Sequence, residues 1–325
     1  GFPESHAASF ALIAYASAWL KCHHPAAFFA AMLNCYPLGF YHPSTLVKDA
    51  ERHGVAMAPI DATRSDWRCT LERSELKPGA TSGEKGRDER APLVLCLGLG
   101  YVAGLRAETG ARIERERALR PFASIADFTA RTAPNRRELD ALAYAGAFAA
   151  FGMDRRTALW QAAAVERDPR GLFAGVEPAT GAVPLAAMDP VSETRADYAA
   201  TGLTIGPHLI AHMREKLRSS GVCAAAELHQ SAHGALVKTA GVVIVRQRPG
   251  TAKGFFFLTL EDETGISNAI VVPDLFQANR ALLHNAAILM VEGVLQKQDG
   301  VVAIRARRFK ELRLGAALPP SHDFR

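Results

Sequence analysis

The stretch Leu97-Gly98-Leu99-Gly100-Tyr101-Val102-Ala103-Gly104 decides which fold the central part of the chain can take. Two glycines alternate with apolar residues, and a third follows four positions later, where a helical pattern begins. This spacing predicts the hairpin of a helix-hairpin-helix unit, in which glycines let the backbone turn tightly while N–H groups face a phosphate. The same spacing also fits a tight turn that only packs two helices together.

A second, weaker copy of the pattern stands at Tyr144-Ala145-Gly146-Ala147-Phe148 and is preceded by Asn135-Arg136-Arg137. Two copies favour the binding of duplex DNA, because backbone contacts to phosphates hold a duplex without reading its sequence. The residues that we expect at this duplex surface are Gly98, Gly100, Tyr101, Gly104, Arg136, Arg137 and Gly146.

From about residue 236 onward the pattern changes from helical to strand-like. One helix is expected at about 273–284, between the third and the fourth of five strands. The expected strands are 237–246, 255–261, 266–272, 287–295 and 301–308. This is the element order of an OB barrel. The predicted fold class is therefore multidomain α+β, with a helical N-terminal part and a tandem helix-hairpin-helix region followed by a five-stranded OB barrel.

Basic and aromatic residues of the strand-rich part predict a surface for single-stranded DNA. An OB fold can stack bases on aromatic rings and hold the backbone with basic side chains. Because successive side chains of a strand point to opposite faces, Phe255 and Phe257 share one face and Phe256 takes the other, so at least one of them is a core residue. The candidate single-strand residues are Arg246, Arg248, Lys253, Phe255, Phe257, Arg305 and Arg307.

The N-terminal residues 5–33 have a helical pattern with a break at His24-Pro25. Ser5 is a candidate N-cap, since its hydroxyl can accept a free backbone N–H. The most apolar run, 7–20, is shorter than the ~20 residues that cross a bilayer, and no charged segment of a signal peptide precedes it. We expect a buried helix there and no membrane association.

Between these regions, residues 67–71 and 93–97 predict two strands of a hairpin joined by a charged, glycine-rich loop. A short helix is expected at 45–53. Residues 168–190 are rich in Pro, Gly and Ala without periodicity, which is typical of a linker.

The charge of the chain is unevenly placed. Its 325 residues carry a formal net charge of +5, with an excess of three basic residues in 93–160 and of four in 235–313. Two basic segments are the pattern expected of polyanion binding. The five cysteines are scattered and form no C-x-x-C pair, so we expect reduced thiols and a cytoplasmic protein.

Side chains for catalysis or metal binding form no recognisable cluster in the sequence. The pairs His208/His212 and His229/His233 have i, i+4 spacing, but no cysteine or carboxylate completes either site, so surface or capping histidines are favoured. The residues Glu261-Asp262-Glu263-Thr264-Gly265 are typical of a turn between strands. We therefore expect no catalytic residue, no metal and no cofactor within this chain.

The motifs, in this order, resemble those of bacterial C-family DNA polymerases, the group of the replicative polymerase III alpha subunit. Residues 1–34 resemble the end of that family's fingers domain, and 97–105 and 135–148 resemble its tandem helix-hairpin-helix region. Residues 197–217 resemble the segment that leads into the OB domain, and 236–265 resemble the OB domain itself.

Within that family, Pro3-Glu4-Ser5-His6 resembles the error-prone branch, the ImuC type, which implies a role in damage-induced translesion synthesis. Ser5 and His6 would then approach the incoming nucleotide and the primer terminus. The palm domain that holds Mg²⁺ would lie upstream of Gly1, so this chain alone is expected to be inactive. Residues 169–173 lack the glutamine of the family's clamp-binding peptide. This implies indirect binding of the sliding clamp and recruitment by accessory mutagenesis proteins of the ImuA and ImuB type.

The resemblance divides the chain into a fingers end, a β-hairpin with the tandem helix-hairpin-helix region, a linker with short helices, an OB domain and a tail. The corresponding ranges are 1–60, 61–165, 166–234, 235–313 and 314–325. Two other functions are considered: a stand-alone, non-enzymatic DNA-binding module and a helix-hairpin-helix glycosylase. The glycosylase is disfavoured, because no suitably placed catalytic Lys or Asp follows the hairpin and no four-cysteine iron–sulfur pattern is present.

Overall fold

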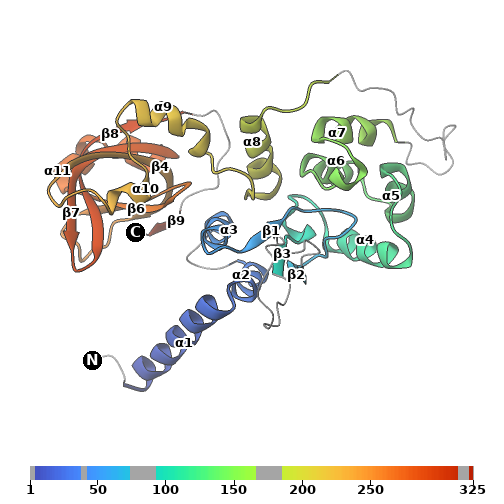
Figure 1. Ribbon diagram of the computed structural model, residues 1–325, viewed down its shortest axis with the longest axis horizontal. Coiled ribbons are helices and arrows are strands. Elements are labelled where there is room, and N and C mark those ends of the chain that lie inside the picture. The colour runs from blue at the N-terminus through green and yellow to red at the C-terminus, as the bar shows by residue number, and fades with distance from the viewer. Residues whose placement is uncertain (1–3, 38–41, 74–92, 166–184, 314–321, 325) are drawn as a thin grey trace, which may run out of the picture. The chain divides into compact units, whose positions relative to one another are not determined.

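The computed structural model of the chain (Figure 1) describes residues 4–37, 42–73, 93–165, 185–313 and 322–324. The chain divides into two compact units. The first contains residues 1–37 and 53–188, and the second contains residues 38–52 and 189–325. Each unit has fully buried side chains of its own, such as Phe128 in the first and Phe256 in the second.

Several expectations concern residues outside the described part of the chain. These are the role of Pro3, the glycine-rich loop before residue 93, the clamp-peptide position 169–173 and most of the tail 314–325. They stay predictions.

Two helices open the first unit, α1 (Glu4–His23) and α2 (Pro25–Asn34), and the predicted break between them is confirmed. The prediction that 7–20 is a buried helix is wrong, because α1 contains no buried residue. Ser5 lies inside the first turn of α1. Large apolar side chains of α1 that are exposed are Phe10, Leu12, Ile13, Tyr15, Trp19 and Leu20. None of the helices in the described ranges is long and apolar enough to span a bilayer.

A three-stranded sheet follows, built from β1 (Ala56–Ala58), β2 (Thr70–Arg73) and β3 (Leu93–Cys96) in the order β1-β3-β2. The predicted hairpin is confirmed, since β2 and β3 pair antiparallel. Strand β1, which pairs parallel with β3, was not expected. Three residues of sequence Ala-Met-Ala carry too little of the alternation that identifies a strand.

Short helices complete the first unit. Three of them have an N-cap residue whose side chain accepts a backbone N–H of the first turn, and these N-caps are Ser124, Asn135 and Asp154. The core between them is aromatic, with Phe128 packed edge-on against Phe148 at a centroid distance of 5.1 Å. These helices are η1 (Leu99–Tyr101), α4 (Ala107–Leu119), α5 (Ile125–Thr132), α6 (Arg136–Tyr144), η2 (Ala149–Phe151) and α7 (Arg155–Ala164).

The second unit is built around a barrel. Its strands are β4 (Leu236–Gln247), β5 (Phe256–Asp262), β6 (Gly265–Val271), β7 (Ile288–Gln298) and β8 (Val301–Glu311). They follow the order β5-β6-β8-β7-β4, and the pairing of β4 with β5 closes the barrel. The parallel pairing of β6 with β8 and the helical segment between β6 and β7 complete the predicted OB topology, which is confirmed.

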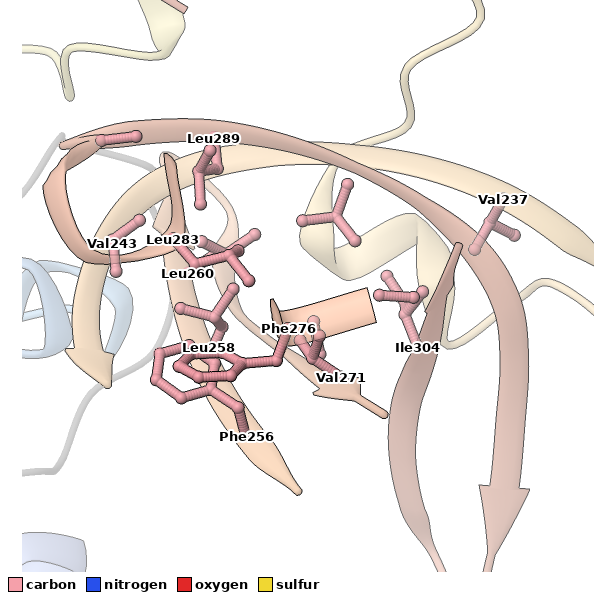
Figure 2. Close-up of a cluster of buried hydrophobic side chains, with 14 of the residues drawn as sticks. Val237, Val243, Phe256, Leu258, Leu260, Val271, Phe276, Leu283, Leu289 and Ile304 are labelled. Atoms are coloured by element: carbon pink, nitrogen blue, oxygen red, sulfur yellow. The ribbon is translucent and has the colours of Figure 1, made fainter. Parts of the chain in front are cut away.

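The barrel interior is apolar, and Figure 2 shows side chains from β4, β5, β6, β7 and β8 and from the helical segment converging there. The predicted helix 273–284 is divided at Asn279 into α11 (Pro273–Ala278) and α12 (Arg280–Asn285). A short further strand, β9 (His322–Phe324), pairs parallel with the end of β4.

The helices of the second unit outside the barrel are α3 (Pro43–Arg52), α8 (Pro190–Thr201), η3 (Ala211–Met213), α9 (Arg214–Ser219) and α10 (Ala225–Leu228). The run Glu261-Asp262-Glu263 binds α3, α9 and α10. Arg52 of α3 donates to Glu261 Oε1 at 2.9 Å, so α3 groups with the barrel and not with the rest of the segment 1–60. Asp262 accepts from Arg214 at 2.9 Å and from the N–H of Gly265 at 3.1 Å, which is the geometry of the predicted turn.

Candidate nucleic-acid interface

The first two glycines of the quoted stretch serve packing. The N–H of Leu99 donates to the carbonyl of Asp66 at 2.7 Å, and the N–H of Gly100 donates to the carbonyl of Trp67 at 3.0 Å. A Cβ on Gly98 would lie 2.4 Å from the Trp67 oxygen, so only glycine fits there. The N–H groups of Leu99 and Gly100 are thus already bonded within the protein and do not face a phosphate.

Two other predicted duplex residues also have structural roles. The half-buried Tyr101 hydroxyl donates to the carbonyl of Leu33 at 2.8 Å, and burial raises the pKa of this phenol above its usual range. Gly146 ends α6 with a φ of 81°, and the N–H groups of Gly146 and Ala147 donate to carbonyls in the last turn of that helix at 3.1 and 3.0 Å. This is a helix C-cap of the Schellman type.

The open turn of the first hairpin lies further along, between Val102 and Arg106, directly before α4. Gly104 has a φ of 84°, which favours glycine, and no atom lies within 4 Å of the position that a Cβ would take. The Arg106 side chain beside it is 56% exposed. Gly104, the last glycine before the helix, was the sequence signal for this turn. The sequence analysis did not include Arg106 among the candidate residues.

Glu138 joins this turn to the start of α6. Its buried carboxylate accepts from Arg106 Nε at 2.8 Å, from the Thr109 hydroxyl at 2.8 Å and from the N–H of Asn135 at 2.9 Å. Burial alone would raise the pKa of Glu138, but these hydrogen bonds outweigh burial and lower the pKa from 4.5 to about 2. The turn and the residues before α6, expected separately from the sequence, therefore lie side by side.

Two exposed arginines at the start of α6 extend this basic edge. Arg136 donates to Asp140 at 2.9 Å and to the carbonyl of Ala163 at 3.3 Å, and its side chain is 43% exposed. Arg137 is exposed and has no ion-pair partner among the residues that the structure describes. Gly104 and Arg106 thus supply a turn with an open tip and one exposed guanidinium, and the exposed Arg137 precedes Glu138, the residue that binds Arg106.

Arg246, a predicted single-strand residue, is buried in the barrel. Only 6% of it is exposed, and its guanidinium donates to the carbonyl of Leu283 at 2.7 Å and to that of Ala286 at 2.5 Å. These carbonyls end α12 and have no partner within the helix. This arrangement contradicts a role for Arg246 as a surface contact, because its donors are used to cap a helix. The sequence pattern could not show that a helix end lies beside this strand.

The predicted residues Phe257 and Arg305 are brought together on the outer face of the barrel. The register pairs Gln247 with Phe257, Phe257 with Ile270, and Ile270 with Arg305 across strands β4, β5, β6 and β8. The neighbouring row contains the buried Leu258, so the row of Phe257 points outward. The alternation in the sequence predicted only that Phe256 and Phe257 lie on opposite faces. We refer to Gln247, Phe257, Ile270 and Arg305 as the outer row; Gln247 and Ile270 were missed in the sequence.

The remaining predicted barrel residues flank this row. Arg248 is exposed and its guanidinium lies 4.7 Å from the ring centroid of Phe276. Lys253 is exposed in the turn between β4 and β5, and Phe255 is half-buried. Arg307 is exposed at the bulge where β8 departs from regular pairing with β7.

The N-terminal candidates Ser5 and His6 are exposed on α1. The His6 ring lies 4.5 Å from that of Phe10, one turn further along the helix, and the Ser5 carbonyl accepts from the Ser9 hydroxyl at 2.8 Å.

The histidine pairs do not form metal sites. His208 is buried, and burial with nearby cationic groups lowers its pKa to about 3. His212 shares a hydrogen bond of 2.9 Å with Thr194, and His233 bonds to the backbone of Lys297. Across the ranges that the structure describes, no three His, Cys, Asp or Glu side chains are grouped so that they could hold a metal ion.

Two family models match the chain in the regions described above. A helix-hairpin-helix motif matches residues 54–158, and an OB-fold nucleic acid binding domain matches residues 237–312. The first range contains the Gly104 turn and α6, and the second contains the whole outer row. The predicted order of the two modules is therefore confirmed.

Error-prone DNA polymerases are similar to the chain over its whole length. The protein of Methylococcus capsulatus is 44% identical over 331 residues, covering 100% of this chain and 31% of the relative. That of Azoarcus sp. is 45% identical over 100% of this chain and 30% of the relative, and that of Burkholderia pseudomallei is 46% identical over 96% and 28%. The chain spans about a third of the length of these curated relatives. By this identity and by its two modules, the chain belongs to the error-prone DNA polymerase family and corresponds to the C-terminal part of its members.

Proposed function

We propose that this chain is the DNA-binding part of an error-prone DNA polymerase that acts in damage-induced translesion synthesis. The observation that supports this most strongly is the whole-length similarity to error-prone DNA polymerases, carried by a helix-hairpin-helix region and an OB barrel in one chain. In this proposal the first unit holds duplex DNA and the barrel guides the single-stranded template.

The duplex is held at the Gly104 turn and the start of α6. The open tip at Gly104 lets a phosphate approach backbone N–H groups, and Arg106 and Arg137 supply positive charge beside it. Glu138 pairs with Arg106 and fixes it in place, with three further hydrogen bonds from neutral donors, so that, within the described residues, the unpaired positive charge at this surface comes mainly from Arg137. Contacts of this kind are independent of DNA sequence, as a polymerase requires.

The single strand lies across the outer row of the barrel. Phe257 offers an aromatic surface for a base, and Arg305 and Arg307 attract the phosphates. The row runs through β5 and β6, the second and third strands of the OB barrel, which are the strands that this fold uses for oligonucleotides.

The wider roles are proposals for the longer protein. Nucleotidyl transfer with Mg²⁺ belongs in a palm domain of the longer protein, outside these 325 residues. Mg²⁺ bound there would stabilise the charge on phosphoryl oxygens. The present chain alone is therefore inactive. Ser5 and His6 approach the nucleotide and the primer terminus. Clamp binding is indirect, through accessory mutagenesis proteins of the ImuA and ImuB type, and the protein acts in the cytoplasm.

The test is the fluorescence anisotropy of the full 325-residue chain with a labelled oligothymidine and with a labelled blunt duplex. Phe257→Ala should weaken oligothymidine binding by about 1–3 kcal/mol, the cost of one lost stack. Arg305→Ala should reduce the slope of log affinity against log salt by about 0.7. Duplex affinity should not change in either variant.

The matched control is Lys310→Ala, an exposed basic residue on the same strand, five residues and about 16 Å from Arg305. It should leave both affinities within about twofold, because it removes one peripheral charge in the screened region. Equal losses in Lys310→Ala and Arg305→Ala would show nonspecific charge attraction and would reject the outer row as the binding surface.

A further inference from the structure

Trp160 is the most exposed tryptophan among those that the structure describes. It lies on α7 with 53% of its surface exposed, although its neighbours Ala158 and Ala162 on the same helix are buried. Neither hairpin turn nor the outer row uses it. An exposed indole is a large apolar surface with one N–H donor, and such a side chain favours a planar partner.

Arg156 lies on the same face of α7 as Trp160, and Arg136 of α6 reaches the end of that helix. Arg156 precedes Trp160 by four residues, and Ala163 follows it by three, which is the i, i+4, i+7 spacing of one helix face. The Ala163 carbonyl accepts from the guanidinium of Arg136 at 3.3 Å, so Arg136 of α6 reaches the end of that face. Figure 1 shows α6 and α7 side by side, in agreement with their contacts.

Along α7, Trp160 therefore lies one turn after Arg156, about 6 Å along the axis, and about 4.5 Å before Ala163, whose carbonyl Arg136 reaches, at 1.5 Å of rise per residue. Arg156 donates to the carbonyl of Ala186 at 2.6 Å and makes no ion pair within the described ranges. Within the described part of the chain, Arg136 forms an ion pair with Asp140, which is itself 39% exposed. The positive charge around the ring is thus only partly neutralised.

We infer that Trp160, with Arg156 and Arg136 on either side, is a stacking site for one unpaired base of single-stranded DNA. The inference rests on the proposed function and adds a second single-strand contact, in the helix-hairpin-helix region. An aromatic surface within positive charge matches a base with its flanking phosphates. An acidic protein segment would complement the charge equally well, but the exposed face of the indole favours a flat, aromatic ligand.

The experiment measures binding of a labelled oligothymidine to the full chain by anisotropy, with quenching of tryptophan emission as a second signal. Trp160→Ala should lower the affinity by about 5- to 150-fold, which is the effect of removing one stack. Trp160→Phe should restore most of the affinity while losing the quenching. The matched control is Trp19→Ala, which removes an exposed tryptophan of α1 that is 45% exposed and has no arginine neighbour on its helix.

The outcomes separate this inference from the proposed function. If the unmodified chain binds neither oligothymidine nor duplex, the proposed function fails. If it binds oligothymidine and responds to Phe257→Ala, but Trp160→Ala has the same affinity and the same quenching as Trp19→Ala, the stacking site is rejected.

Discussion

Replacing Glu138 by glutamine removes the charge that joins the Gly104 turn to α6 while keeping the size of the side chain. The hydrogen bonds of Glu138 lower its pKa from 4.5 to about 2 in the folded chain. At about 1.36 kcal/mol per pKa unit, ionised Glu138 stabilises the fold by about 3 kcal/mol relative to its neutral form. We expect Glu138→Gln to reduce the free energy of unfolding of the first unit by about this amount at pH 7.

Urea unfolding followed by tryptophan fluorescence measures this unit selectively. The three tryptophans of the chain, Trp19, Trp67 and Trp160, all lie in the first unit. The matched control is Asp140→Asn, which removes a partly exposed pair with Arg136 and should cost about 0.5 kcal/mol or less.

The pH dependence gives a second, independent test. Because the folded pKa of Glu138 lies below its unfolded value, its contribution is fully present above about pH 4.5 and is lost as the pH falls toward about 2. The stability difference between the unmodified chain and Glu138→Gln should shrink over that window. A difference that stays constant with pH, or a loss at pH 7 no larger than that of Asp140→Asn, would refute the assigned role of the ionised carboxylate.

Four further predictions concern single substitutions. Arg246→Ala should destabilise the barrel by about 1–3 kcal/mol, since two helix-end carbonyls lose their donors, while the salt slope of DNA binding at equal folded fraction stays unchanged. Gly98→Ala should lower the free energy of unfolding of the first unit by about 1–3 kcal/mol, because the added Cβ clashes with the backbone at Trp67. Gly104→Ala should weaken duplex binding, because a side chain there costs about 1–2 kcal/mol in the left-handed backbone conformation of the turn. Burial raises the pKa of Glu261 to about 7 despite its ion pair with Arg52. The contribution of Glu261 to stability is therefore full below about pH 4.5 and is lost as the pH rises through 7. Hydrogen exchange of the β5 amides should show this loss of protection with rising pH, and Glu261→Gln should make the protection less dependent on pH.

The sequence predicted the modules better than the roles of individual residues. Strand alternation correctly placed Phe256 and Phe257 on opposite faces, because successive side chains of a strand alternate, and the structure shows that Phe256 is the one inside the barrel. The turn composition of 261–265 was interpreted correctly for the same local reason, since Asp262 bonds to the residues that follow it.

Roles that depend on contacts distant in sequence could not be predicted. Gly98 and Gly100 have the spacing of a phosphate-binding turn, but the segment at Trp67 occupies that space. Arg246 has the composition of a basic surface and caps α12 instead. The apolar pattern of α1 predicts burial in some partner, and no residue of α1 is buried in the described structure. In each case tertiary packing, which one-dimensional patterns do not record, decides the outcome.

The most direct test of the central claim is whether the chain binds duplex and single strand at the same time. A labelled oligothymidine is titrated into the full chain saturated with unlabelled blunt duplex, and its anisotropy is recorded. The proposed duplex surface at Gly104 and the outer row of the barrel are different sets of residues. The affinity for oligothymidine should therefore stay within about fourfold of its value without duplex, a margin that allows for the salt-screened repulsion between the two bound nucleic acids. Displacement in direct proportion to the duplex added would show one shared surface and would contradict the account.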